Sequence, residues 1–278
     1  MPDRPELSCV VPAYNSVPLL ARTLMSIVTQ SAITPEVVVS DDSTTPEVRA
    51  FVDGLAGLYP NVRYFPGART GNPVDNWNAG LSRATGRWRM VVHHDDFFCD
   101  PGCLRRAVAR LAAGEGEVLA LGHGPAGRAG TSRFALAAAL ARGLKLKPWS
   151  LYAINWIGPP AAVMFPADPA ITFDARLCWL VDVDLFARLL RPGVRLIRDE
   201  AMCLVSLRHA EQITARIDTH LLKLREIRFL WAVDPDRLGP WRVLSLAYAA
   251  CRVAPWRWKH SRVTPVPSIP NATARRDS

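Results

Sequence analysis

Short apolar runs alternate with segments of helical periodicity along the first half of the chain. The runs predict strands at 7–11, 36–40, 62–65, 88–92 and 117–121. Between them, apolar residues three and four positions apart predict helices at 19–30, 46–58, 75–85 and 102–113. This alternation is typical of an α/β fold in which a mostly parallel sheet carries helices on both faces.

The second half of the chain has a less regular order of elements. Its pattern predicts a Gly-rich loop at 122–131, a helix at 134–142, a strand at 161–165, a helix at 179–190 and one or two strands within 195–207. Helical periodicity returns from Ile217 and again over 241–252. We therefore expect a main domain over 1–214, a basic amphipathic helical extension over 215–262 and a disordered tail over 263–278.

The composition is that of a globular protein. Of the 278 residues, 49% are hydrophobic and 21% are charged. The chain starts without a basic-then-apolar leader, and no apolar run reaches the roughly 18 residues of a membrane span. A cytoplasmic protein is therefore expected, and its six cysteines, which form no CxxC pair, are expected to be reduced.

The net charge of +9 is concentrated at the carboxyl end of the chain. Residues 215–278 contain 12 Lys and Arg against five Asp and Glu, which leaves the first 214 residues close to neutral. Aromatic and basic residues alternate in Trp256-Arg257-Trp258-Lys259. This pattern is typical of a segment that contacts an anionic membrane surface, which here would be the inner face of the membrane. The alternative is that these helices pack on the main domain. No nucleic-acid recognition motif is present, so nucleic acid is not an expected partner.

Four ionisable residues, His93-His94-Asp95-Asp96, follow the apolar run at 88–92. Strand alternation would put His93 and Asp95 on one side and His94 and Asp96 on the other. His93 with Asp95, or Asp95 alone with substrate phosphates, would suit a hard cation such as Mg²⁺ or Mn²⁺. The alternative is a polar loop that caps the next helix.

Two more polar segments follow predicted strands. Pro12-Ala13-Tyr14-Asn15 follows the first strand, and Asp41-Asp42-Ser43 follows the second. A doubly wound sheet binds ligands at the carboxyl ends of its strands, where a Tyr can stack on a base and an Asp can accept a base N–H. No GxGxxG or GxxxxGK[ST] motif is present, which disfavours a dinucleotide site and a P-loop.

The order and spacing of six segments resemble family 2 glycosyltransferases of the GT-A fold. These segments are Val10 to Asn15, Leu24 to Ser43, Asn76-Trp77-Asn78-Ala79-Gly80-Leu81, His93-His94-Asp95-Asp96, Asn155 to Phe165, and Val181-Asp182-Val183-Asp184-Leu185-x-x-Arg188-Leu189. The similarity extends from Leu7 to Thr214. It implies a Rossmann-like, mostly parallel sheet flanked by helices, with 1–214 as the catalytic domain and a C-terminal helical appendage.

The resemblance also implies roles for particular residues. The nucleotide base and ribose would be held by Pro12, Tyr14, Asp41 and Asp42, with Asn78 lining the donor pocket. Asp95 would bind Mg²⁺ or Mn²⁺ that bridges the donor diphosphate. The first Asp of the family's DxD motif is His93 here, a softer ligand that is less suited to Mg²⁺.

Three further positions depend on the same resemblance. Asp182 would be the general base, with Asp184 as its rival, since side chains two residues apart on a helix point about 200° apart. The Glu that usually precedes the base is Val181 in this chain. His209 would contact the diphosphate or complete the metal coordination, although a surface or packing role is the equal alternative.

The expected function is thus inverting transfer of a sugar from a nucleoside-diphosphate donor to a hydroxyl group of a glycan, glycolipid or metabolite. Such a transfer is a single displacement that needs a base for the acceptor proton and a cation for the departing diphosphate. His93 and Val181 differ from the family pattern, so the alternative of a non-catalytic nucleotide-sugar-binding protein stays open. A sugar nucleotidyltransferase is a further alternative, although Pro12-Ala13-Tyr14-Asn15-Ser16 is not its usual Gly-rich basic loop.

Overall fold

The computed structural model describes residues 4–125, 147–207, 219–241 and 247. An eight-stranded sheet runs through it in the order β3-β2-β1-β4-β7-β6-β8-β5. The strands are β1 (Leu7–Ala13), β2 (Glu36–Asp41), β3 (Val62–Pro66), β4 (Trp88–Val91), β5 (Asp96–Phe98), β6 (Val118–Pro125), β7 (Val163–Pro166) and β8 (Leu196–Ser206). The first four strands are parallel to one another, as is β8 to β6, whereas β7 is antiparallel to β4 and β6, and β5 is antiparallel to β8. The predicted α/β class and mostly parallel sheet are confirmed.

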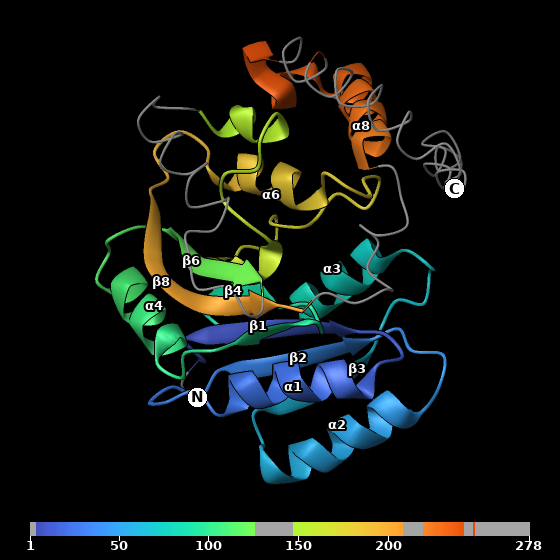
Figure 1. Cartoon of the computed structure of the whole chain (residues 1–278), viewed down its shortest axis with the longest axis vertical. Coiled ribbons are helices and arrows are strands. Elements are labelled where there is room, and N and C mark those ends of the chain that lie inside the picture. The colour runs from blue at the N-terminus through green and yellow to red at the C-terminus, as the bar shows by residue number, and fades with distance from the viewer. Residues whose placement is uncertain (1–3, 126–146, 208–218, 242–246, 248–278) are drawn as a thin grey trace.

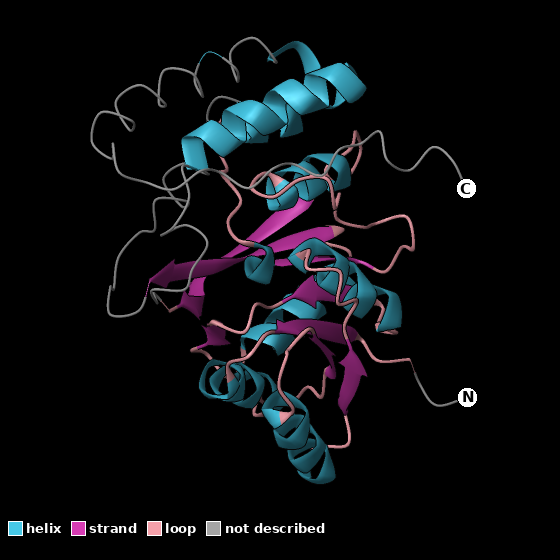
Figure 2. Ribbon diagram, turned by 90° about the vertical axis from the view of Figure 1, so that its right-hand side faces the viewer, coloured by secondary structure: helices cyan, strands magenta, loops and turns pink. Residues whose placement is uncertain are grey.

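Helices cover both faces of the sheet (Figures 1 and 2). One face packs against α1 (Val17–Val28), α2 (Glu47–Leu58) and α4 (Cys103–Ala112). The core on the other side includes residues of α3 (Pro73–Arg83), α6 (Val181–Leu189) and α8 (Thr219–Val233), and α8 lies beyond α6 (Figure 1). Three short 3₁₀ helices are η1 (Pro148–Tyr152), η2 (Pro160–Ala162) and η3 (Pro235–Trp241). No helix within the described ranges combines the length and apolar character that crossing a bilayer requires.

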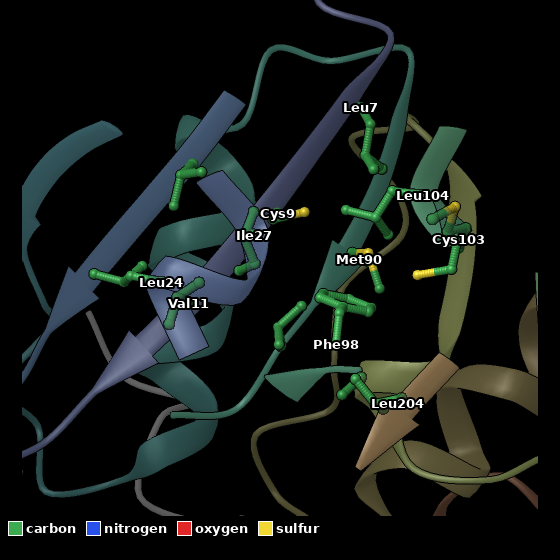
Figure 3. Close-up of a cluster of buried hydrophobic side chains, with 14 of the residues drawn as sticks. Leu7, Cys9, Val11, Leu24, Ile27, Met90, Phe98, Cys103, Leu104 and Leu204 are labelled. Atoms are coloured by element: carbon green, nitrogen blue, oxygen red, sulfur yellow. The ribbon is translucent and has the colours of Figure 1, made fainter. Parts of the chain in front are cut away.

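Side-chain alternation along β1 explains the two-sided core. Cys9 and Val11 point toward Leu24 and Ile27 of α1 (Figure 3), whereas Val10 belongs to the core on the α3 face. A run in which every residue is apolar is what a strand buried on both faces requires. On the α3 face, Gly80 lets the helix approach closely, because a Cβ at this position would overlap the Val10 side chain.

Two parts of the sheet differ from the sequence prediction. The loop predicted at 122–131 is wrong for 122–125, because β6 continues to Pro125 and pairs there with β8. β5 was not predicted, since its three residues form a strand only by antiparallel pairing with β8. The predicted helix at 134–142, nearly all of 241–252 and the tail from 263 lie outside the described residues.

Candidate functional site

A tight turn after β4 brings three of the predicted residues together. One ligand atom each from His93, Asp95 and Asp96 lies within 4.8 Å of the other two. The predicted separation of Asp96 from His93 and Asp95 is wrong, because β4 ends at Val91 and strand alternation stops there. The chain turns back instead, and the Asp96 N–H donates to the His93 carbonyl at 3.0 Å.

Buried hydroxyl groups hold this turn from α1 and β8. Thr23, which is 1% exposed, donates to the backbone oxygens of His94 and Asp96 at 2.9 and 2.7 Å. The Ser206 hydroxyl at the end of β8 donates to the Asp96 carboxylate, and the Leu207 N–H donates to the Asp95 carbonyl at 3.0 Å. The turn is therefore fixed by two elements that lie far apart in the sequence.

The chemistry of this cluster suits a divalent cation. Burial and then the negative charge of Asp95 raise the pKa of Asp96 to about 7. His93 Nδ1 lies 3.8 Å from an Asp96 oxygen, while its buried Nε2 has no hydrogen-bond partner among the described residues. Two adjacent carboxylates and an imidazole short of a partner are groups that a bound cation would satisfy.

The residues predicted to hold the nucleotide lie at the carboxyl ends of β1 and β2. Pro12 is buried within β1, whereas Tyr14, just beyond it, is 56% exposed. Asp41 ends β2 and accepts hydrogen bonds from the Ser43 N–H at 2.9 Å and the Tyr64 hydroxyl at 3.0 Å. Asp42 accepts from the Arg69 N–H at 2.8 Å. An open pocket next to these groups is lined by Asp41, Ser43, Thr44, Thr45, Pro46, Arg49, Tyr64, Pro66 and Arg69.

The predicted donor residue Asn78 bridges α3 to the segment before α6. Its side-chain amide donates to the Phe173 carbonyl and accepts from the Phe173 N–H, both at 2.9 Å. The preceding residue, Trp77, has its ring centroid 4.7 Å from that of His93 and 5.3 Å from that of Phe173. This contact places the segment that leads to α6 beside the turn after β4.

Asp182, the predicted base, lies in the first turn of α6 and is partly buried. Its Oδ2 accepts from Asn155 Nδ2 at 3.2 Å, and its Oδ1 accepts from the Val183 N–H at 2.7 Å. Asn155 is itself held by the N–H groups of Ile157 and Gly158, each 3.0 Å from its Oδ1. Burial raises the pKa of Asp182 to about 6, with a smaller contribution in the same direction from the charge of Glu226.

The rival carboxylate, Asp184, is fully buried and engaged by three side chains. It accepts from the Tyr152 hydroxyl at 2.7 Å, from Arg188 Nε at 2.8 Å and from an Arg237 guanidinium nitrogen at 3.3 Å. Both oxygens are therefore occupied by structural partners. The predicted opposition of Asp182 and Asp184 on α6 agrees with these different surroundings.

Two residues near the predicted groups were not singled out from the sequence as site residues. Strand alternation predicts Asp96 on the side opposite to His93 and Asp95, which is wrong. The family resemblance includes Asn155 in a segment but implies no role for it. The Gly158-Pro159-Pro160 segment after Asn155 predicts a rigid loop. Nothing in the local sequence indicates that Asn155 contacts Asp182. His209 lies outside the described residues.

Two solved structures have a fold similar to that of this chain. Residues 1–349 of S. aureus TarS, in a crystal structure with UDP-GlcNAc, align with a TM-score of 0.65 and 18% identity over 92% of this chain and 74% of that one. The mannosyltransferase PcManGT of Pyrobaculum calidifontis, in complex with GDP-Man and Mn²⁺, aligns with a TM-score of 0.59 at 18% identity, over 96% and 78% of the two chains. At this identity the likeness establishes the fold, which is the predicted GT-A fold.

Sequence comparison identifies the family. The succinoglycan biosynthesis protein ExoO of Rhizobium meliloti (strain 1021) is 35% identical over 114 residues, which is 41% of this chain and 32% of ExoO. The match thus spans about a third of the length of this curated relative. The model of the family named Glycosyl transferase family 2 matches residues 8–190, from β1 to the end of α6. The chain therefore belongs to glycosyl transferase family 2.

Proposed function

We propose that this protein is an inverting glycosyltransferase, which moves a sugar from a nucleoside-diphosphate donor to a hydroxyl acceptor with the help of Mg²⁺ or Mn²⁺. The observation that carries the proposal is the cluster of His93, Asp95 and Asp96 at the edge of the sheet in a chain of this family. The sugar nucleotides UDP-GlcNAc and GDP-Man bound in the two similar structures support a donor of this class.

The metal would be held by Asp95, with Asp96 and His93 as the neighbouring ligands. When bound, a divalent cation would offset the negative charge of the departing diphosphate. The protein supplies the fixed turn, since Thr23 and Ser206 hold the backbone oxygen and carboxylate of Asp96. The imidazole of His93 makes Mn²⁺ a better match than Mg²⁺, because nitrogen ligands are softer than carboxylates.

The donor nucleotide would lie along the carboxyl ends of β1 and β2. Tyr14 is exposed enough to stack on a base, and Asp41 and Asp42 are near neighbours of the open pocket there. Arg49 and Arg69 in the lining of that pocket offer positive charge to a phosphate or ribose group. Asn78 is engaged with Phe173, so we assign it to holding the site together instead of contacting the donor.

Asp182 would remove the proton from the acceptor hydroxyl. Its carboxylate is partly buried, and it accepts hydrogen bonds from Asn155 and from the Val183 N–H. A general base works best when its pKa approaches the working pH, and burial moves Asp182 in this direction. Asp184 is a poor candidate, because a base must be free to contact the acceptor and Asp184 is enclosed by Tyr152, Arg188 and Arg237.

The rate of transfer is expected to depend on the protonation of Asp182. With its pKa near 6, kcat/KM should fall about tenfold per pH unit below pH 6. The folded-state pKa lies above the unfolded value, so protonation of Asp182 itself favours the folded state and does not contribute to acid unfolding. The measurement is kcat/KM across pH at saturating Mn²⁺, with circular dichroism at each pH. A flat profile to pH 5 would contradict the assignment.

A thermal-shift screen of UDP-, GDP- and dTDP-sugars, each with Mg²⁺, Mn²⁺ or EDTA, tests the donor class. A ligand present at 100 times its Kd stabilises the folded state by about 2.7 kcal/mol, which corresponds to roughly 5–10 °C for a chain of this size. We expect such a shift for one base, and only with metal. Binding without donor hydrolysis or transfer would favour the non-catalytic alternative, and no shift with any donor would reject the proposal.

The acceptor class rests on the chemistry of the site alone, so glycans, glycolipids and glycosylated metabolites all remain consistent with a hydroxyl that meets Asp182. Contact with an anionic membrane stays a prediction. The Trp256-Arg257-Trp258-Lys259 segment on which it rests lies outside the described residues.

A further inference from the structure

Glu226 is a buried carboxylate in the middle of α8, with 0% of its surface exposed. Its Oε1 accepts from the Cys178 and Trp179 N–H groups at 2.6 and 2.9 Å, and its Oε2 accepts from the Leu180 N–H at 2.7 Å. Among the described residues, no Lys or Arg lies within ion-pair distance of this carboxylate. Its charge is therefore stabilised by backbone dipoles from a segment 46 to 48 residues earlier in the chain.

Those three N–H groups lead directly into α6, the helix that carries Asp182. A helix begins with N–H groups that have no partner inside the helix, and Ser, Thr, Asp or Asn usually caps them. Leu180 occupies the cap position of α6 and makes no side-chain cap hydrogen bond, and the residues before it, Cys178 and Trp179, cannot replace it. Glu226 of α8 instead binds the N–H of Leu180 and those of the two residues before it, which fixes the chain where it enters α6. Its negative charge is also favourable next to the positive end of the α6 dipole.

A second contact from the same part of the chain reaches α6 two residues after Asp182. Arg237 in η3 contacts Asp184 at 3.3 Å and Asp174, which lies before α6, at 2.9 Å. Asp184 is also bonded to Tyr152 of η1, and Asn155 in the loop after η1 contacts Asp182. The first turn of α6 is thus held by α8 at its start and by η1 and η3 along its buried side.

We propose that residues 219–241 are part of the catalytic unit, and that Glu226 is a positioning residue that fixes Asp182 through the chain entering α6. This inference rests on the proposed role of Asp182 as the base. Without Glu226, the N–H groups of the three residues that lead into α6 lose their acceptor, and the turn that carries Asp182 loses its anchor. A base displaced by about 1 Å can cost about 100-fold in rate.

Glu226→Gln tests the proposal in the full chain, because Gln keeps the shape but replaces one acceptor oxygen by a donor. We expect kcat to fall about 10- to 100-fold, with the donor KM unchanged within about twofold. The concentration of nucleotide-binding sites is measured by calorimetry and used to calculate kcat. Unfolded protein in the sample therefore does not lower the value of kcat. Arg228→Gln, an exposed change on the same helix, is the matched control and should behave as wild type.

The outcomes separate positioning from simple destabilisation. Wild-type kcat per binding site in Glu226→Gln would overturn the proposal, as would a loss of rate fully explained by lost binding sites. If Glu226→Gln yields no folded protein, Arg237→Gln is measured in the same way and should lower kcat per site by about tenfold. Full transfer by Asp182→Asn would instead reject the base assignment itself, whatever the Glu226 variant does.

Discussion

Asp182→Asn is expected to lower kcat for sugar transfer by about 10²- to 10⁴-fold, the usual contribution of a general base. The change removes the basic oxygen but keeps the size of the side chain and an acceptor for the Val183 N–H. The proposed nucleotide site lies at β1 and β2, away from α6, so donor affinity should stay within about threefold. Steady-state kinetics and calorimetry on the same preparation provide both values.

The neighbouring change Asp184→Asn gives the matched contrast. Asp184 is buried between Tyr152, Arg188 and Arg237, and breaking a buried ion pair costs about 3–5 kcal/mol. We expect the melting temperature to fall by about 10 °C or more. Asp182→Asn should lose activity with a stable fold, because burial raises the pKa of Asp182 and so already disfavours the charged carboxylate that the change removes. If Asp182→Asn transfers sugar at the wild-type rate, another residue is the base.

Asp95→Ala is expected to weaken metal-dependent donor binding by about 100-fold or more. Mutation of groups that only support metal ligands already costs about 10- to 100-fold in affinity, and Asp95 is proposed as a direct ligand. His93 and Asp96 would remain, but a cation would lose one of the two carboxylates in the cluster. The measurement is calorimetric titration of the nucleotide with Mn²⁺ and, separately, with EDTA.

Glu115→Ala removes an exposed carboxylate far from this turn in the sequence and serves as the control. In EDTA, the wild type, Asp95→Ala and Glu115→Ala should bind nucleotide equally weakly, because the metal contribution is absent from all three. Unchanged affinity of Asp95→Ala with Mn²⁺ would remove Asp95 from the metal site. The melting temperature of each variant, measured without ligand, shows whether its fold is intact.

The parallel half of the sheet was predictable because each of its strands is an apolar run between helices. The predicted strand at 36–40 and β2 (Glu36–Asp41) differ by one residue. The predicted strand at 62–65 and β3 (Val62–Pro66) also differ by one residue. Local sequence suffices for β2, since all six of its residues are buried, as in a strand covered on both faces.

Elements whose formation depends on a distant partner were not predictable. Gly122 and Gly124 suggest a loop, yet this part of β6 is a strand because it pairs with β8. Asp96 was placed wrongly because alternation assumes a continuing strand, whereas Thr23 and Ser206 hold a turn. Likewise, nothing in the sequence near Leu180 predicts the acceptor of its N–H group, since Glu226 comes from another helix. Asp182 was preferred from the family resemblance alone, and its surroundings now supply a physical reason.

The hydrogen bond between Ser206 and Asp96 also affects the order in which parts of the protein fold. The two residues are 110 positions apart, and β5 pairs only with β8. Contacts of such separation form late in folding, because a long loop must close first. During synthesis, the nascent chain therefore cannot complete the turn until β8 has left the ribosome. Capture of the proposed metal is therefore expected to be among the last events of biogenesis, after β1 and β2 have already paired.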